Sequence, residues 1–236
     1  TGHYARIEKL ENGRYALRMS KTSAKDQTYA LYNLTQDQLS RTLMPVGDYE
    51  KDEIREIAKK FNLRVANKPD SQEICFVSDN DYASFVESEI GKKMPEGNFV
   101  TADGEILGKH KGILHYTIGQ RKGLGIALGH PIFVTEIRPE TNEVVIGEND
   151  DVFGYSLEAN NLNAMAVESF FDGMRAIGKI RYSHKGEHCT IKVLGEDRIR
   201  IDFDEKVRAI TPGQAVVLYD ETGLVLGGGT IIGRCD

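Results

Sequence analysis

Over the first ninety residues, the spacing of apolar positions changes between strand-like and helix-like. Residues 13–19 broadly alternate as a half-buried strand does, and the polar residues 20–27 are predicted to form a loop. Residues 63–67 also look like a strand. Between these, residues 51–61 are predicted to form an amphipathic helix, because their apolar residues recur at i, i+3, i+4 and i+7 (Ile54, Ile57, Ala58 and Phe61). This segment is therefore predicted to be α/β.

Short polar signals mark two further helices and a turn. Thr35 and Gln38 have the spacing of a capping box, which predicts a short helix after Thr35. Residues 79–90 place their apolar side chains on one helical face. Asp103-Gly104 separates two short apolar runs, as the turn of a tight hairpin does.

From about residue 155 to the end, the pattern is that of strands alone. Short apolar runs are broken by Gly, Asp and Asn, which predicts a small closed barrel or a sandwich. The run Gly227–Gly229 lies inside one such strand and is predicted to be a bulge or a bend. Strands are expected at residues 176–184, 188–195, 198–205, 215–220 and 224–233.

The charge of the chain narrows its possible partners. The formal net charge of the 236 residues is −6, which argues against a general nucleic-acid binder but not against a specific RNA enzyme with a local basic surface. Residues 108–123 contain four lysines and arginines and no Asp or Glu. Composition leaves two interpretations of this stretch open, a surface that contacts RNA and a solvated basic loop.

Cysteine usage and apolar runs exclude several classes of protein. No apolar run is long enough to cross a bilayer, and the chain does not open with a signal peptide. The three cysteines, Cys75, Cys189 and Cys235, form no CxxC pair, so neither a disulfide framework nor a metal site is expected. No SGGxDS or Walker-type phosphate loop is present. A reducing cytoplasm is the expected location.

Of the three cysteines, Cys75 is the one whose position in the sequence is compatible with a catalytic role. It follows the polar run KPDSQE (68–73) and Ile74, and it precedes two apolar residues. A thiol there could be a nucleophile at the mouth of a loop. It could equally be a small core residue, since free cysteines are among the most buried residues. The run contains a lysine and two carboxylates, so its charge does not decide between the two.

Seven stretches together resemble the tRNA-specific 2-thiouridylase family, the bacterial enzymes that thiolate the wobble uridine of tRNA. The combination of HYTIGQRKGLGI (115–126) with KPDSQEICF (68–76) is the most specific. The resemblance spans essentially the whole chain. The other stretches are TGHYAR (1–6), KDQTYALY (25–32), LMPVGDYEKDEIREIA (43–58), KIRYSH (179–184) and PGQAVVLYD (212–220).

The resemblance implies a protein of three parts. Residues 1–78 would be the carboxy-terminal part of an ATP-pyrophosphatase catalytic domain, of the adenine nucleotide alpha hydrolase-like fold. Residues 79–150 would form a small central domain, and residues 151–236 an all-β barrel that contacts tRNA. The family's SGGxDS loop and first catalytic cysteine lie before the TGHYAR motif. The chain is therefore expected to be a carboxy-terminal portion that lacks both and is inactive alone.

The resemblance also implies the reaction. ATP, with Mg²⁺, would adenylate the C2 oxygen of the wobble uracil, and Cys75 would carry a persulfide whose terminal sulfur goes to C2. The other catalytic cysteine would then resolve the carrier by forming a disulfide. ATP would be a cosubstrate, so no permanently bound cofactor is expected. The sulfur donor would be a sulfur-relay protein or a cysteine desulfurase, and no membrane is expected to take part.

Positions that match the family's motifs give the expected site. Gly2 matches an ATP-binding glycine. Lysine and arginine suit phosphates, and an aromatic side chain can stack on an unpaired base. Residue types alone would favour ordinary turns at residues 2–3 and 25–27, and would equally allow a cross-strand pair at Arg181 and Tyr182. Contacts with tRNA are expected at His3, Lys25, Asp26, Gln27, Arg181, Tyr182 and Gln214.

Two hypotheses without catalysis compete with the sulfurtransferase. The chain could be a tRNA-binding fragment in which Cys75 is idle, or a β-barrel module related to translation factors that has no sulfur chemistry. The motif around Cys75 separates the enzyme from the barrel module, because a docking barrel has no need of such a motif.

Overall fold

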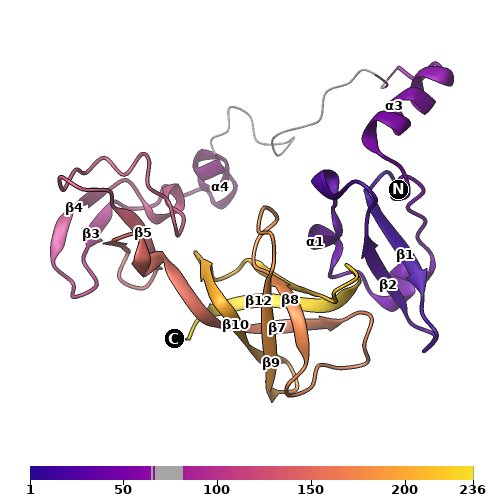
Figure 1. Ribbon diagram of the computed structural model, residues 1–236. Coiled ribbons are helices and arrows are strands. Elements are labelled where there is room, and N and C mark those ends of the chain that lie inside the picture. The colour runs from indigo at the N-terminus through magenta and orange to yellow at the C-terminus, as the bar shows by residue number, and fades with distance from the viewer. Residues whose placement is uncertain (65, 67–81, 236) are drawn as a thin grey trace. The chain divides into compact units, whose positions relative to one another are not determined.

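The computed structural model describes residues 1–64, 66 and 82–235 (Figure 1). The chain divides into two compact units. Residues 1–68 and 155–236 form the first unit, and residues 69–154 form the second. The first unit therefore joins segments from the two ends of the sequence.

The amino-terminal segment of the first unit is a two-stranded antiparallel sheet with short helices. Strand β1 (Ala5–Lys9) pairs with β2 (Tyr15–Met19) along its whole length. Strand β1 was missed by the sequence analysis, which predicted β2 alone. The helices are α1 (Thr28–Leu31), α2 (Gln36–Ser40) and α3 (Lys51–Lys60).

Six strands close into a barrel, in the order β10-β7-β12-β11-β8-β9 (Figure 1). The described residues 155–235 contain no α-helix, which confirms the prediction of an all-β segment and of a closed barrel. The strands are β7 (Phe153–Ala164), β8 (Arg175–Lys179), β9 (Glu187–Gly195), β10 (Arg198–Arg208), β11 (Ala215–Tyr219) and β12 (Val225–Arg234).

The amino-terminal segment and the barrel share one hydrophobic core. Leu17 of β2 and Leu39 of α2 are fully buried in the same cluster as Val217 and Leu218 of β11. Burying one leucine side chain stabilises a fold by about 1.5–3 kcal/mol. Apolar packing is therefore a strong contribution to holding the segment on the barrel.

Polar side chains orient the amino-terminal segment on the barrel at the end of strand β7. Arg14 donates from Nη2 to the carbonyl of Ala164 at 2.6 Å and from Nε to the carbonyl of Met165 at 2.9 Å. Gln36 donates from Nε2 to the carbonyls of Tyr15 and Met165, at 2.8 and 3.1 Å. These bonds satisfy backbone acceptors that would otherwise be left without partners away from the barrel ladder.

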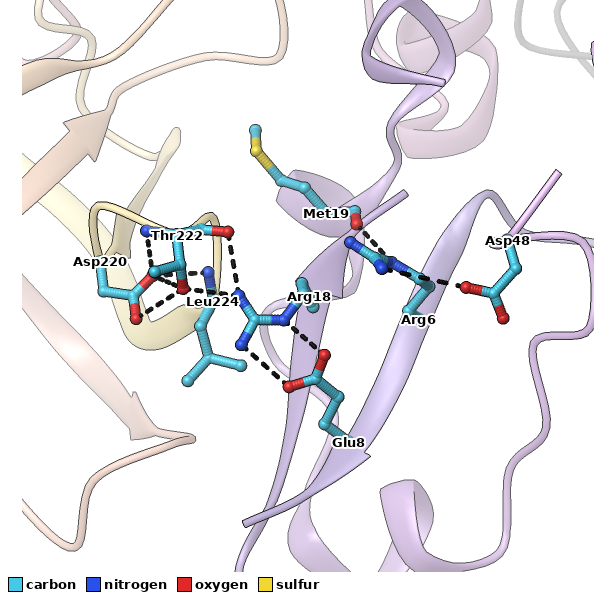
Figure 2. Close-up of polar contacts among 8 residues, drawn as sticks. All are labelled: Arg6, Glu8, Arg18, Met19, Asp48, Asp220, Thr222 and Leu224. Carbon is cyan, nitrogen blue, oxygen red and sulfur yellow. Dashed lines mark hydrogen bonds and ion pairs between the residues drawn. The ribbon is translucent and has the colours of Figure 1, made fainter. Parts of the chain in front are cut away.

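Arg18 of β2 ties the small sheet to the turn between β11 and β12 (Figure 2). Its Nη2 donates to Glu8 at 2.9 Å, and its Nη1 donates to the carbonyl of Thr222 at 2.9 Å. The Asp220 carboxylate shapes this turn by accepting from the N–H groups of Thr222 and Leu224, at 2.8 Å each. Partly exposed ion pairs contribute less than about 1 kcal/mol, so this network orients a contact that the apolar core stabilises.

The described part of the second unit is a small sheet with one α-helix and short 3-10 turns. The sheet has the order β4-β3-β6-β5, and its core packs Phe99 and Tyr116 edge-on against His110. Both ring nitrogens of His110 are bonded, one to the N–H of Gly112 and the other to the carbonyl of Asn142, each at 3.1 Å. Burial lowers the pKa of His110, which favours the neutral ring that these two bonds require. The elements are α4 (Tyr82–Ile90), β3 (Gly97–Val100), β4 (Ile106–His110), β5 (Phe133–Arg138) and β6 (Glu143–Gly147).

Several local predictions are confirmed. The capping box forms as expected, with the Thr35 hydroxyl accepting from the N–H of Gln38 and the Gln38 side chain accepting from the N–H of Thr35. The helix predicted at 51–61 is α3, and the described part of the helix predicted at 79–90 is α4. The turn predicted at Asp103-Gly104 joins β3 to β4.

Two predicted strands are wrong in part. Residues 63, 64 and 66 are not extended, because Asn62 takes a left-handed φ of 54° after α3 and the N–H of Ala66 bonds to the carbonyl of Leu63. Residues 65 and 67 lie outside the described part of the chain. The strand predicted at 176–184 ends at Lys179, after which the N–H of His184 bonds to the carbonyl of Arg181 in a turn.

The glycine run in β12 allows the segment around α1 to approach the barrel. The predicted irregularity is confirmed, since the register of β12 against β7 shifts between Gly228 and Thr230. A Cβ atom at Gly228 would lie 2.5 Å from the carbonyl oxygen of Val216 and 2.7 Å from the ring of Tyr32, which follows α1. A side chain at this position would therefore push Tyr32 away from the barrel.

Replacing Gly228 by alanine is expected to lower the free energy of unfolding by about 1–3 kcal/mol, the usual cost of overpacking. Gly233→Ala is the matched control, because a Cβ atom at Gly233 in the same strand meets nothing within 4 Å. Urea unfolding of both variants measures the difference. Equal midpoints for the two variants would contradict this account of the contact.

Candidate nucleic-acid interface

Asp26 organises the loop that precedes α1. Its side chain is 6% exposed, and its Oδ1 accepts from the N–H of Ser20 at 2.9 Å. Its Oδ2 accepts from the Thr28 hydroxyl at 2.5 Å and lies 3.3 Å from the N–H of Thr28. Both carboxylate oxygens are therefore committed to the chain's own donors. The Asp26 side chain therefore positions the loop, and its expected contact with tRNA stays a prediction.

Two side-chain hydrogen bonds join this loop and α1 to β11. The Thr28 hydroxyl gives its proton to Asp26, so it accepts from the hydroxyl of Tyr219 at 3.2 Å. The hydroxyl of Tyr29 donates to the carbonyl of Ala215 at 2.8 Å. Burial raises the pKa of Tyr29 to about 12 and also raises the pKa of Tyr219, so both phenols remain protonated donors at neutral pH.

Arg181 lies in the turn after β8 and braces a strained residue. Its Nη2 donates to the carbonyl of Ala209 at 2.7 Å and also to the carbonyl of Arg208. Ala209 has a φ of 59°, a left-handed conformation that costs an L-residue roughly 1–2 kcal/mol. Burial, followed by the charge of Arg208, lowers the pKa of Arg181, although an arginine remains charged.

Basic side chains lie around the place where the loop before α1 meets β11. The ε-amino group of Lys179, the last residue of β8, lies 5.7 Å from the centroid of the Tyr219 ring. Burial lowers the pKa of Lys179, and the charge of Asp26 opposes that shift. Burial and the charges of Arg181 and Lys179 lower the pKa of His184, so these side chains act on one another. We call the region formed by residues 25–29, 179–184 and 208–219 the junction.

Most of the predicted tRNA contacts lie at or next to the junction. Gln27 bonds twice to Tyr4, through its side-chain oxygen and its N–H at 2.9 Å each, which places the exposed His3 beside the loop. Tyr182 is 53% exposed, and the exposed Gln214 directly precedes Ala215. Lys25 closes the short helical turn at the start of the loop. The structure therefore brings four separate sequence segments together.

Gly2 is the described residue expected to bind ATP, and that expectation stays a prediction. Gly2 is exposed, and a Cβ atom there would meet nothing within 4 Å, so no close backbone approach within the chain requires a glycine. No cluster of three or more His, Cys, Asp or Glu among the described residues could hold a metal ion. No step is therefore assigned to ATP or to a metal on these residues.

Cys75 lies outside the described residues, and the two described cysteines have no disulfide partner. Cys189 is buried in β9, and burial raises the pKa of its thiol to about 12. Cys235 is partly buried and free. A thiol as buried as Cys189 is unreactive at neutral pH.

A cleft elsewhere on the barrel has the wrong charge for a phosphate ligand. It has a volume of about 430 Å³, and its lining includes Leu162, Phe170 and Ile199 together with the carboxylates of Glu168 and Glu196. Two acidic side chains would repel an anion. The junction is therefore the stronger candidate for contact with a nucleic acid.

No described helix combines the length and the apolar character that crossing a membrane requires.

Three family models match consecutive parts of the chain. Residues 1–79 match the tRNA methyl transferase HUP domain, and residues 83–148 match the tRNA methyl transferase PRC-barrel domain. Residues 156–231 match the aminomethyltransferase beta-barrel domain. These matches agree with an α/β remnant, a small middle domain and a carboxy-terminal barrel.

Curated relatives decide the family. The chain is 67% identical to the tRNA-specific 2-thiouridylase MnmA of Lachnoclostridium phytofermentans over 232 residues, which are 98% of this chain and 65% of the relative. The chain is 58% identical to the MnmA of Clostridioides difficile and 51% identical to that of Carboxydothermus hydrogenoformans, over 98% of this chain and 64% and 63% of those relatives. The chain belongs to the tRNA-specific 2-thiouridylase family. It spans a little less than two thirds of the length of these relatives.

Sequence reasoning missed two of the residues that assemble the junction. Tyr219 and Lys179 lie inside quoted motifs, PGQAVVLYD and KIRYSH, but no role was predicted for either. Strand alternation was the available signal, because Ala176 and Gly178 of β8 are buried while Lys179 lies on the other face. The pairing of Tyr219 with Thr28, 191 residues away, has no local sequence signal.

Proposed function

We propose that this chain binds tRNA at the junction and takes part in the 2-thiolation of the wobble uridine, with Cys75 as the residue that carries the sulfur. The observation that carries the proposal is the convergence of motif residues from distant segments on one basic surface. His3, the loop at 25–27, the turn at 181–182 and Gln214 all lie at or next to it. The high identity to named 2-thiouridylases supports the same function.

The chemistry of the junction suits RNA. An exposed tyrosine, Tyr182, offers a face on which an unpaired base can stack, and stacking of this kind contributes about 1–3 kcal/mol per base. Arg181 beside it adds a fixed positive charge, because two backbone carbonyls hold its guanidinium. Recognition of RNA commonly combines stacked, splayed bases with contacts to the backbone.

Two cysteine thiols are enough to account for every bond and electron pair in the sulfur transfer. The terminal sulfur of the Cys75 persulfide attacks C2 of a wobble uridine whose C2 oxygen has been activated, a C–S bond forms, and the activated oxygen leaves. A second thiolate then attacks the Cys75 sulfur and breaks the persulfide S–S bond. The transferred sulfur keeps the electron pair and becomes the thiocarbonyl sulfur, while the two cysteine sulfurs are oxidised to a disulfide.

Tyr182→Ala is expected to weaken tRNA binding roughly 5- to 150-fold, the equivalent of losing one stacked base. Tyr155→Ala is the matched control, because Tyr155 is 51% exposed on the barrel and lies outside the junction. Filter binding with an unmodified tRNA transcript that has uridine at the wobble position measures both variants. Equal affinities of the two variants, or no tRNA binding by the unmodified chain, would contradict the proposal.

Cys75 is expected to accept one sulfur atom when the chain is incubated with a cysteine desulfurase and cysteine. Intact-protein mass spectrometry should show the added sulfur in the unmodified chain and in Cys235→Ser, and should lose it in Cys75→Ser. Retention of the added sulfur in Cys75→Ser would rule out Cys75 as the carrier. A folded chain that gains no sulfur would favour the non-catalytic tRNA-binding alternative.

A further inference from the structure

We propose that Lys179 binds a phosphate group of the tRNA at the junction, a contact that no motif assigned. The proposal deepens the proposed function and rests on it. Lys179 is the last residue of β8 and directly precedes the turn that holds Arg181 and Tyr182. Its position, its surroundings and its lack of polar partners support this role.

The fold places Lys179 on the outer face of the barrel. Its neighbours Gly178 and Ile180 are buried, and side chains alternate along a strand, so the Lys179 side chain lies on the opposite face. Lys179 pairs in register with Val217 of β11. Its ammonium lies over the ring of Tyr219, whose hydroxyl holds the loop at 25–28. Lys179 is therefore adjacent to the site where the two segments meet.

The aliphatic stem of Lys179 is confined on a second side. A Cβ atom on Gly186 would lie 3.5 Å from Cγ of Lys179, so the loop before β9 passes close to the stem. A confined stem has fewer rotamers to lose when its ammonium binds a ligand. This makes Lys179 a better preorganised cation than a lysine on an open surface.

The ammonium of Lys179 has no hydrogen bond and no ion pair within the described residues, although the side chain is partly buried. An ammonium has three donors, and removing them from water without an acceptor is costly. Contact with an aromatic ring replaces part of that loss. Asp26 is near enough to act on the Lys179 charge, but both of its oxygens are already committed to Ser20 and Thr28.

A phosphate oxygen is the acceptor that fits this site. Arg181 and His184 are the basic neighbours, and the carboxylate of Glu187 also acts on His184. An anion placed beside Lys179 would meet the positive charges of Lys179 and Arg181, and the ring of His184, whose pKa is lowered, would add a neutral hydrogen-bonding group. A neutral acceptor would gain much less from the same position, because its attraction to the ammonium lacks the charge–charge part.

Lys179→Gln is expected to weaken tRNA binding. It should also reduce the slope of the logarithm of the binding constant against the logarithm of the salt concentration by about 1, because one phosphate contact is lost. The dissociation constant is measured from low to moderate salt with the same tRNA transcript. Lys179→Arg keeps the charge and should keep the slope. Lys192→Gln is the matched control, since it removes one charge from an exposed position in β9 outside the junction.

The outcomes separate the inference from the function on which it rests. A shallower slope in Lys179→Gln alone supports a phosphate contact at this residue. An equal loss of slope in Lys179→Gln and Lys192→Gln would mean that net charge is responsible. An unchanged slope in Lys179→Gln would mean that Lys179 makes no phosphate contact. Either result would overturn the inference. Lys179→Met, which keeps an apolar stem, replaces Lys179→Gln if thermal unfolding shows that variant to be unfolded. Absence of tRNA binding by the unmodified chain would overturn the proposed function and the inference together.

Discussion

The packing of residues 26–32 against the barrel is the contact on which the rest of the first unit depends. Asp26 shapes the loop, and Thr28 bonds to Tyr219. The ring of Tyr32 fills the space that a side chain at Gly228 would need. The shared apolar core stabilises the contact, and the hydrogen bonds fix the orientation of the segment on the barrel. Because the contact is close and specific, surface residues of the loop and of the turn after β8 keep a fixed spacing. A ligand can then be recognised by both segments at once.

The distribution of charge suits selective binding of RNA under the proposed function. The chain is acidic overall, with a formal net charge of −6, so long-range attraction to any polyanion is weak. Binding then depends on local contacts of the kind found at the junction, where Lys179, Arg181 and His184 act on one another. A general basic surface would bind most RNA molecules through their phosphates. A small basic region on an acidic protein favours the RNA that also satisfies the stacking and hydrogen-bond positions.

Local signals in the sequence predicted local structure well. The capping box at Thr35 and the helix at 51–60 depend on spacings of three or four residues, which can be read directly. Strand β1 was missed although its pairing with β2 is local, with only residues 10–14 between the two strands. The strand predicted through residue 184 failed after Lys179, since the backbone bond of His184 to Arg181 closes a turn that apolar alternation does not signal.

Motif resemblance identified candidate residues but could not assign each of them a physical role. The expected contact of Asp26 with tRNA stays a prediction, and the fold adds that its buried carboxylate accepts hydrogen bonds inside the loop. Tyr219 and Lys179 were passed over, because their importance follows from neighbours that are distant in sequence. Burial and partner geometry are set by the three-dimensional fold. They are the two properties that a motif cannot supply.

Hydrogen exchange of the chain with and without the tRNA transcript tests the central claim, that the junction is one surface for RNA. The account predicts that backbone amides in three segments, residues 25–29, 180–184 and 211–215, become protected together when tRNA binds. These segments are far apart in sequence, so joint protection would reflect their convergence in the fold. Protection that leaves all three segments unchanged, while other parts of the chain respond, would contradict the account.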